Sequence, residues 1–181
     1  QFKISEMDSA QVIEQVLNRT IDVGFTGTVL EKKRCVYIPF YEDELIIITP
    51  NNEKFRKLKK ENEKTTWIEE EPLIMREEGS GTRKEAEKQL KKSGIDISAL
   101  NVVASIENQE TIKRSVENGM GVSVISRLAA QKEIEAGELL DFALPLGDRV
   151  RNINIVYNKD IRLSGMTERF IRVVREVYGE S

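Results

Sequence analysis

Residues 2–26 of this 181-residue chain read FKISEMDSAQVIEQVLNRTIDVGFT, and residues 102–126 read VVASIENQETIKRSVENGMGVSVIS. Each stretch begins with a strand-like run, continues with a capping residue and an apolar face at helical spacing, and ends in a second apolar run. The matched positions are Asp8 and Asn108, Val12 and Ile112, Val16 and Val116, Asn18 and Asn118, and Thr26 and Ser126. The repeat predicts two similar α/β lobes; because few paired residues are identical, a chance match is the alternative.

Around the repeat, strand-like runs alternate with helical patterns, which is typical of an α/β fold with mostly parallel pairing. We expect strands at 1–6, 21–25, 35–40, 45–49, 73–76, 102–106, 122–125, 139–144 and 153–157. Helices should begin near residues 8, 83, 108 and 127, a solvated helix and loop should cover 51–64, and a last helix over 164–178 should bury Phe170, Val173, Val174 and Val177. Open α/β sheets bind ligands at the carboxyl edge, so two such edges facing each other would form a cleft.

The composition excludes several classes of protein. Apolar residues make up 39 % and charged residues 33 %, as in soluble globular domains, and no apolar run reaches the roughly 20 residues of a membrane-spanning helix. Lys and Arg number 28 against 31 Asp and Glu, and the net charge of -3 argues against direct DNA binding. The chain has no histidine and one cysteine, Cys35, which removes histidine-based catalysis, intramolecular disulfides and CxxC sites.

The clearest local motif is the loop EEGSGTR at residues 77–83, between a predicted strand and a predicted helix. The glycines Gly79 and Gly81 allow close backbone approach, the helix start offers unpaired N–H groups, and Ser80 and Thr82 add hydroxyl donors. Arg83 would add a fixed positive charge. The motif suits a carboxylate, sulfate or phosphate and is neither a Walker A loop nor GxGxxG. The alternative is an ordinary turn in which Ser80 or Thr82 caps the helix.

Two other segments follow predicted strands. Thr26, Gly27 and Thr28 would offer hydroxyls and backbone donors from the other lobe, or form a plain turn. Asn108 serves first as a helix cap and second as a ligand contact.

An enzyme would need an acid/base group, and without histidine the candidates in the expected cleft are Glu77, Glu78 and Glu107. Nothing in the sequence pairs them. We therefore expect no enzyme activity, no catalytic residue, no metal site and no cofactor.

Three passages resemble the LysR-type transcriptional regulators. VIEQVLNRTIDVGFTG at 12–27 is similar to their "L..G.lDvai" stretch, and ENQETIKRSVENGMGVSVISR at 107–127 is similar to their "lV..G.Gi.llP" stretch, with Ser126 in the usual place of proline. PLIMREEGSGTRKEAE at 72–87 resembles the strand, loop and helix that open the second lobe. The resemblance covers essentially the whole chain in order.

The resemblance implies an effector-binding domain with a fold similar to type 2 periplasmic binding proteins, in which two Rossmann-like α/β lobes hold a ligand in a central cleft. On this analogy lobe I comprises residues 1–72 and 147–181, and lobe II comprises 73–146. The family pattern also includes a winged helix-turn-helix, a linker helix and a first strand and helix of lobe I that we do not find here. We therefore interpret the chain as an N-terminally truncated fragment, in which part of the pocket is absent.

Family roles carried onto matching positions give a set of ligand-binding residues: Thr26, Gly27, Ser80, Gly81, Thr82, Arg83, Asn108 and Ser126. The implied partners are a small, anionic effector, further copies of the chain in a homodimer or tetramer, and DNA only through the missing N-terminal domain. The resemblance also implies a cytoplasmic bacterial regulator with no membrane partner. The alternative is an exported solute-binding protein of the same bilobal fold, which an upstream signal peptide, in place of a helix-turn-helix, would distinguish.

Overall fold

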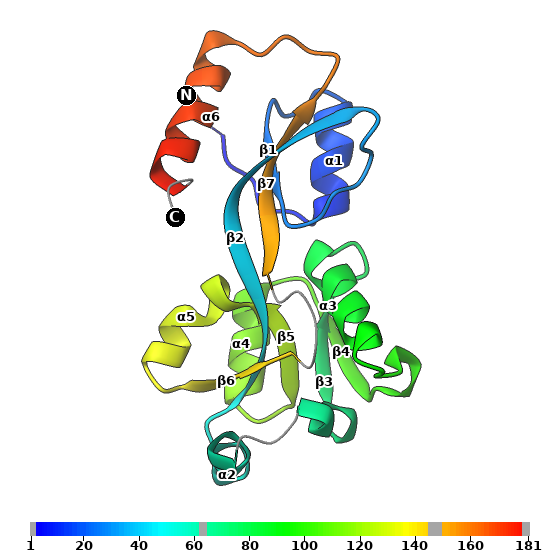
Figure 1. The fold of residues 1–181 in the computed structure, drawn as a ribbon, viewed down its shortest axis with the longest axis vertical. Helices are drawn as coiled ribbons and strands as arrows, with labels where there is room; N and C mark the ends of the chain where they lie inside the picture. Colours follow the sequence, from blue (N-terminus) through cyan, green and yellow to red (C-terminus); the bar gives the residue numbers. More distant parts are fainter. Residues whose placement is uncertain (1–2, 62–64, 145–149, 179–181) are drawn as a thin grey trace. The chain divides into compact units, whose positions relative to one another are not determined.

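The computed structural model describes residues 3–61, 65–144 and 150–178, and the chain divides into two compact units (Figure 1). Unit 1 comprises Gln1–Glu42 and Arg151–Ser181, and unit 2 comprises Asp43–Val150. The strand β2 (Cys35–Pro50) continues from unit 1 into unit 2. The cleft expected between two lobes stays a prediction.

Unit 2 is built on a mixed sheet. Its strands are the second part of β2 together with β3 (Leu73–Arg76), β4 (Val102–Ile106), β5 (Val122–Ser126) and β6 (Leu139–Ala143). β3 lies between β4 and β5 and is parallel to both, whereas β2 runs antiparallel to β5 on one side and to β6 on the other. The register places Ile47 opposite both Val124 and Phe142, in the interior of the unit.

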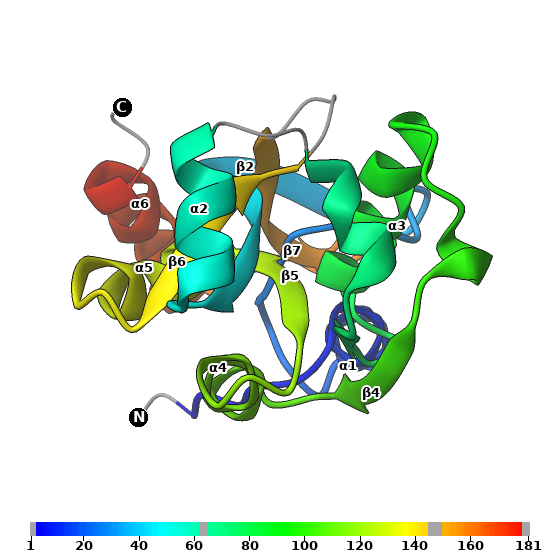
Figure 2. The same ribbon diagram turned by 90° about the horizontal axis from the view of Figure 1, so that it is seen from below.

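Helices cover both faces of this sheet, and Figure 2 shows α3 and α4 on either side of β5. The helices are α2 (Glu53–Glu61), α3 (Gly81–Lys92), α4 (Gln109–Glu117) and α5 (Arg127–Glu135), with 3-10 helices at Thr65–Glu70 and Ile97–Ala99. Leu90 of α3 packs in one core, and Ile112 of α4 packs in the other. Successive residues of β2 enter these cores alternately, Ile47 the first and Ile46 the second, which explains the unbroken apolar run of this strand.

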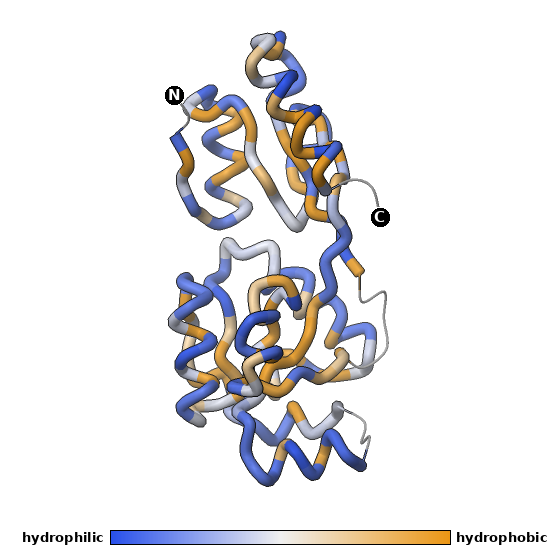
Figure 3. The backbone as a smooth tube through the Cα atoms, turned by 90° about the vertical axis from the view of Figure 1, so that its left-hand side faces the viewer, coloured by the Kyte–Doolittle hydropathy of each residue, from blue (hydrophilic) through white to orange (hydrophobic). Residues whose placement is uncertain are grey.

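α2 is the solvated helix that its charge predicted. Figure 3 colours it mostly hydrophilic, and Phe55 is its buried residue. The end of the predicted loop, at 62–64, lies outside the described residues.

Unit 1 has a smaller sheet, in which β7 (Val150–Asn158) lies between β1 (Gly24–Thr26) and the first part of β2. β1 and β7 are antiparallel, as are the pairs of β2 with β5 and β6. The mostly parallel pairing expected from the sequence is therefore wrong, because parallel pairs join β3 to β4 and β5 while β2 runs against its neighbours in unit 2. α1 (Ser9–Leu17) packs its apolar face, with Val12, Ile13 and Val16, into a core with Val156. α6 (Gly165–Tyr178) contacts the sheet through aromatic rings, with the Phe170 and Phe25 centroids 6.2 Å apart.

Four predictions about the elements differ from the structure. Residues 3–6 form no strand, because no described segment pairs with them and Ile4 is 94 % exposed; residues 1 and 2 lie outside the described part. The strands expected at 35–40 and 45–49 are one continuous β2, since no glycine or turn separates them. In α6 only Ile171 is buried among the described residues, whereas Val173 and Val177 are 46 % and 65 % exposed, and Phe170 and Val174 are half-buried.

The fourth difference concerns the lobe boundaries. The division falls after Glu42 and before Arg151, whereas the sequence placed it after residue 72 and before 147. Residues 43–72 join unit 2 because the second part of β2 pairs with β5 and β6, and Trp67 packs in a core of that unit. Within the described ranges, no helix is long and apolar enough to cross a membrane.

Candidate functional site

Three parallel strands of unit 2 end at one edge of its sheet. Each is followed by a helix, so β3 leads to α3, β4 to α4 and β5 to α5. The residues at the three helix starts are Ser80, Asn108 and Ser126, all named in advance as candidate ligand contacts. Because these helices begin at the carboxyl ends of parallel strands, their unpaired N–H groups gather at this edge.

The strand order makes one part of this edge the best place for a ligand. The chain passes from β3 outward to β4 and then returns to β5 on the other side of β3. α3 and α4, which make these two connections, pack in different cores on opposite faces of the sheet. Open α/β sheets commonly bind ligands at the carboxyl ends of two neighbouring strands where the strand order reverses in this way.

The start of α3 offers donors there. Ser80 is the N-cap, is only 2 % exposed and accepts a hydrogen bond from the Arg83 backbone N–H at 3.4 Å. Gly81 is buried, and Thr82 is half-buried. Within the described residues the Thr82 hydroxyl has no hydrogen-bond partner, so it can donate to a ligand. Ser80 thus caps the helix, as expected for an ordinary turn, and it also lies at the sheet edge where a ligand contact is expected.

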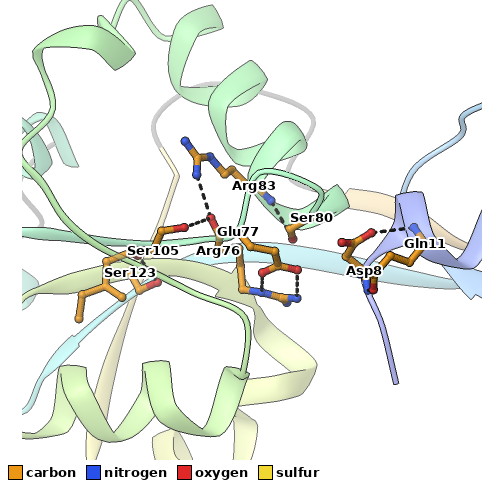
Figure 4. A network of polar contacts seen from close by, with 9 residues as sticks. Asp8, Gln11, Arg76, Glu77, Ser80, Arg83, Ser105 and Ser123 are labelled. Atoms are coloured by element: carbon orange, nitrogen blue, oxygen red, sulfur yellow. Dashed lines mark hydrogen bonds and ion pairs between the residues drawn. The ribbon is translucent and has the colours of Figure 1, made fainter. Parts of the chain in front are cut away.

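The sequence reasoning missed a charged pair beside this loop. Arg76, the last residue of β3, binds Glu77 through two parallel hydrogen bonds, from Nε at 2.8 Å and from Nη2 at 2.9 Å (Figure 4). The side chains are 11 % and 16 % exposed. Bidentate guanidinium–carboxylate geometry is the arrangement by which proteins also recognise ligand carboxylates and phosphates. The sequence feature that could have indicated this pair is an arginine at the end of a predicted strand, directly before the glycine loop.

The Arg76 carbonyl connects the neighbouring elements. It accepts hydrogen bonds from Arg83 Nη1 at 3.2 Å and from the Ser105 hydroxyl at 3.4 Å, which joins α3 and β4 to β3 (Figure 4). Arg83 Nε also donates to Glu87 at 2.8 Å. The Arg83 guanidinium is therefore bound back onto β3 and α3, and its contact with a ligand stays a prediction.

The other two caps differ from each other. Asn108 is exposed and accepts the Thr111 N–H at 2.9 Å, as an ordinary helix cap does. Ser126 makes no such cap, because its hydroxyl donates to the buried Asp43 carboxylate at 2.6 Å. A ligand contact by Ser126 would therefore come from its backbone unless that hydrogen bond is broken.

Ion pairs surround the start of α5. Arg127 donates to Glu44 at 2.6 Å and binds Asp141 at 2.9 Å, and Asp141 also pairs with Lys59. Burial lowers the pKa of Arg127, but hydrogen bonds to Glu44 and Asp141 outweigh it, so the pKa is raised. Burial raises the pKa of Asp141, but hydrogen bonds from Lys59 and Arg127 bring it below 3.8. Arg127 is thus shared between two carboxylates on different strands, whereas Arg76 binds the single carboxylate of its neighbour Glu77.

The two candidates in unit 1 lie at the end of β1. Thr26 is 2 % exposed, and its hydroxyl donates to the Thr28 carbonyl at 2.9 Å. Gly27 lies against the Arg151 guanidinium, because an added Cβ would come within 2.8 Å of Nη1. The segment thus forms the plain turn that was the alternative to a ligand-binding loop. Its role in ligand binding stays a prediction.

The carboxyl groups considered for acid/base chemistry are either paired or exposed. Glu77 is paired with Arg76, and Glu78 and Glu107 are exposed. Across residues 3–61, 65–144 and 150–178, no cluster of three or more Cys, Asp or Glu side chains could hold a metal ion. The edge presents hydroxyls, helix-start N–H groups and one guanidinium, all of them hydrogen-bond donors.

Comparison with known families and proteins gives a consistent result. The family model described as the LysR substrate binding domain matches residues 1–179. The uncharacterized HTH-type transcriptional regulator YeiE of Escherichia coli K12 is 27 % identical over 170 residues, 94 % of this chain and 56 % of YeiE. The uncharacterized HTH-type regulator MJ0300 of Methanocaldococcus jannaschii is 30 % identical over 176 residues, 97 % of this chain and 58 % of that protein. The chain thus spans just over half the length of these relatives.

Solved structures show the same fold. The regulatory domain of CcmR from Synechocystis PCC6803, in complex with 2-PG, has a TM-score of 0.80 at 23 % identity and covers 96 % of this chain and 81 % of its own. The effector-binding domain of QuiR, in complex with shikimate, has a TM-score of 0.81 at 13 % identity, with coverages of 95 % and 78 %. The α/β class expected from the repeat is confirmed.

Proposed function

The chain belongs to the LysR substrate binding domain family, as its three quoted passages predicted, and we propose that it senses a small anionic metabolite for a transcriptional regulator. The observation that carries the proposal is the edge of unit 2 where β3 ends and α3 begins. There the buried Ser80 and the half-buried Thr82, whose hydroxyl has no partner among the described residues, lie at the start of α3, and the Arg76 guanidinium lies at the end of β3. Hydroxyls, free N–H groups and a guanidinium together favour an anion over a neutral ligand.

The proposal assigns no catalysis to the domain. The chain has no histidine, and among the carboxyl groups considered for proton transfer Glu77, the one nearest α3, is held by Arg76. Binding alone suffices for a sensor, because an effector that binds one conformation more tightly shifts the population toward it. We accordingly propose a domain that works without a metal or cofactor.

The relatives suggest the setting in which this sensor works. YeiE and MJ0300 are named HTH-type regulators and are longer than this chain. We propose that the full protein is cytoplasmic, binds DNA through a helix-turn-helix outside this sequence and assembles as a homodimer or tetramer. No observation favours the exported solute-binding alternative, since the family model and both named relatives are of the regulator type.

A ligand screen tests the proposal. Thermal unfolding is followed in phosphate, sulfate and small carboxylates at constant ionic strength, because a ligand that binds the folded state raises the Tm. We expect at least one anion to stabilise the wild type and Thr82→Ala to weaken its binding by about 0.5–1.5 kcal/mol, or more if the hydroxyl meets a charged atom. Thr66→Ala makes the same change at an exposed position of unit 2 and should leave the affinity unaltered. Failure of every anion to raise the Tm would contradict the proposal.

A further inference from the structure

We propose that Arg76 is a ligand-binding residue and that the Glu77 carboxylate occupies its place in the absence of ligand, so that an anionic effector must displace it. The inference rests on the proposed function and adds a residue and a mechanism to it. Glu77 then acts as a built-in competitor that sets the affinity of the site.

The geometry of the pair supports this role. Nε and Nη2 of Arg76 point to the two oxygens of a single carboxylate, at 2.8 and 2.9 Å. A free carboxylate or a phosphate would present two oxygens to the guanidinium in the same way. Figure 4 shows the pair beside Ser80, on the side of the loop where α3 begins.

Burial makes the guanidinium dependent on an anion. The Arg76 side chain is only 11 % exposed, and removing a positive charge from water is costly unless it is paired and hydrogen-bonded. Glu77 is its ion-pair partner within the described chain. Another anion at the same place would satisfy the same requirement of the guanidinium, while the displaced Glu77 carboxylate would have to turn to water.

Glu77 can be exchanged without unfolding the loop. Its carbonyl accepts the Ser80 N–H at 3.0 Å, which holds the backbone of the turn in place independently of the carboxylate. Rotation of the Glu77 side chain alone would release Arg76. Since Ser80 also caps α3, the helix start keeps its structure while the guanidinium changes partner.

Competition of this kind favours particular ligands. A ligand that only hydrogen-bonds cannot replace a carboxylate on a buried guanidinium, whereas an anion with two oxygens in one plane can. The pair therefore rejects neutral analogues and weakens every anion by the cost of displacing Glu77.

Binding of inorganic phosphate at constant ionic strength, measured by isothermal titration, tests the inference. Glu77→Gln keeps the shape of the side chain and removes the competing charge, so it should bind phosphate roughly tenfold more tightly than the wild type. Glu78→Gln removes the same charge at the exposed neighbouring residue and should stay within about twofold of the wild type. The double variant Arg76→Gln/Glu77→Gln should lose the gain. Far-UV circular dichroism and the fluorescence of Trp67, the single tryptophan, establish that each variant is folded.

The outcomes separate this inference from the proposed function. Equal phosphate affinity of Glu77→Gln and Glu78→Gln overturns the role of Glu77, while stabilisation of the wild type by any anion in the screen upholds the function. A gain that survives in the double variant overturns the role of Arg76. Absence of phosphate binding in Glu77→Gln overturns the inference, and the proposed function fails with it only if no other anion raises the Tm.

Discussion

The helix and strand from Asp8 to Thr26 in unit 1 and those from Asn108 to Ser126 in unit 2 share one local structure. Asp8 accepts the Gln11 N–H at 2.8 Å, and Asn108 accepts the Thr111 N–H at 2.9 Å. The helices α1 and α4 begin and end at residues that are 100 positions apart, as the repeat predicted.

Both helices end in the same motif. The N–H of Thr20 bonds to the Gln15 carbonyl, and that of Met120 bonds to the Ser115 carbonyl, each at 3.0 Å. The preceding residue has a positive φ in each case, 62° at Arg19 and 78° at Gly119. These are the six-to-one bond and left-handed residue of a Schellman motif.

Beyond the helices the two copies differ. An added Cβ on Gly24 would come within 2.2 Å of Val12, so this residue of β1 faces α1. In unit 2 the residue matched to Gly24 is Val124, which lies in the core on the α3 side, whereas Ile125 packs with α4. The strand faces are thus shifted by one residue between the copies. Local hydrogen bonds are repeated, and the packing around them is not.

The largest loss of stability is expected from a substitution at Gly121, immediately before β5. Gly121 matches Ile21 of unit 1, and a Cβ there would lie 2.3 Å from the Pro72 carbonyl oxygen, which already accepts the Val122 N–H at 2.8 Å. We expect Gly121→Ala to lower the free energy of unfolding of unit 2 by about 3 kcal/mol. Urea unfolding followed by Trp67 fluorescence measures this, because Trp67 lies in a core of unit 2.

Gly94→Ala is the control for this prediction. Gly94 also lies in unit 2, at φ 83° with no atom within 4 Å of an added Cβ, so only the left-handed conformation opposes alanine there. Its cost should be about 1 kcal/mol. Equal effects of the two substitutions would show that the strand can move away from Pro72. The close contact with Pro72 would then not explain why position 121 is glycine where unit 1 has Ile21.

A smaller effect is expected at position 113, where unit 2 has a buried lysine and the matched position of unit 1 has an apolar residue. Lys113 matches Ile13; both are buried, but Lys113 donates to the Ala129 carbonyl at 3.0 Å and to Glu133 at 2.6 Å. Burial lowers the pKa of Lys113, but hydrogen bonds to Glu110 and Glu133 raise it above 10.5. We expect Lys113→Met to destabilise unit 2 by about 2 kcal/mol at pH 7, since Glu133 and the carbonyl lose a charged donor. Trp67 fluorescence in urea is again the measurement.

The pH dependence of this stability difference tests whether the ion pair between Lys113 and Glu133 causes it. Burial raises the pKa of Glu133, but the hydrogen bond from Lys113 brings it below 4.5. A carboxylate with a lowered pKa in the folded state contributes stability above 4.5, and this contribution is lost as the pH falls through the folded value. The difference between wild type and Lys113→Met should therefore shrink below pH 4.5. A constant difference down to pH 3 would assign the effect to packing instead.

The smallest effect is expected at the helix ends. Arg19 adopts a left-handed conformation that costs a residue with a side chain about 1 kcal/mol, and Gly119 adopts it freely. Arg19→Gly should therefore stabilise α1 by about 0.5–1 kcal/mol after the added chain entropy of glycine. Slower amide hydrogen exchange in α1, with α4 unchanged, would support this, and Gly119→Arg should have the opposite effect on α4. An unchanged α1 would indicate that the Arg19 side chain already compensates the strain.

Much of the fold could be predicted because its signals are short. Asp8 and Asn108, each followed by apolar residues at helical spacing, were sufficient for α1 and α4. The glycine loop left Ser80 or Thr82 as the cap of α3, and the structure has Ser80 in that place. Arg76 was missed because successive side chains of a strand point to opposite faces, so its pairing with Glu77 depends on β3 ending at that residue.

The sequence by itself determined the α/β class, the two capped helix–strand copies and the LysR family, because caps and apolar spacing act between residues three to six positions apart. The tertiary structure decided that β2 runs unbroken through two units, that α6 keeps an exposed apolar side, and that Lys113 is buried against Glu133. These outcomes depend on which distant segments pack together, since burial and ion pairing are set by neighbours in space and not by neighbours in the chain.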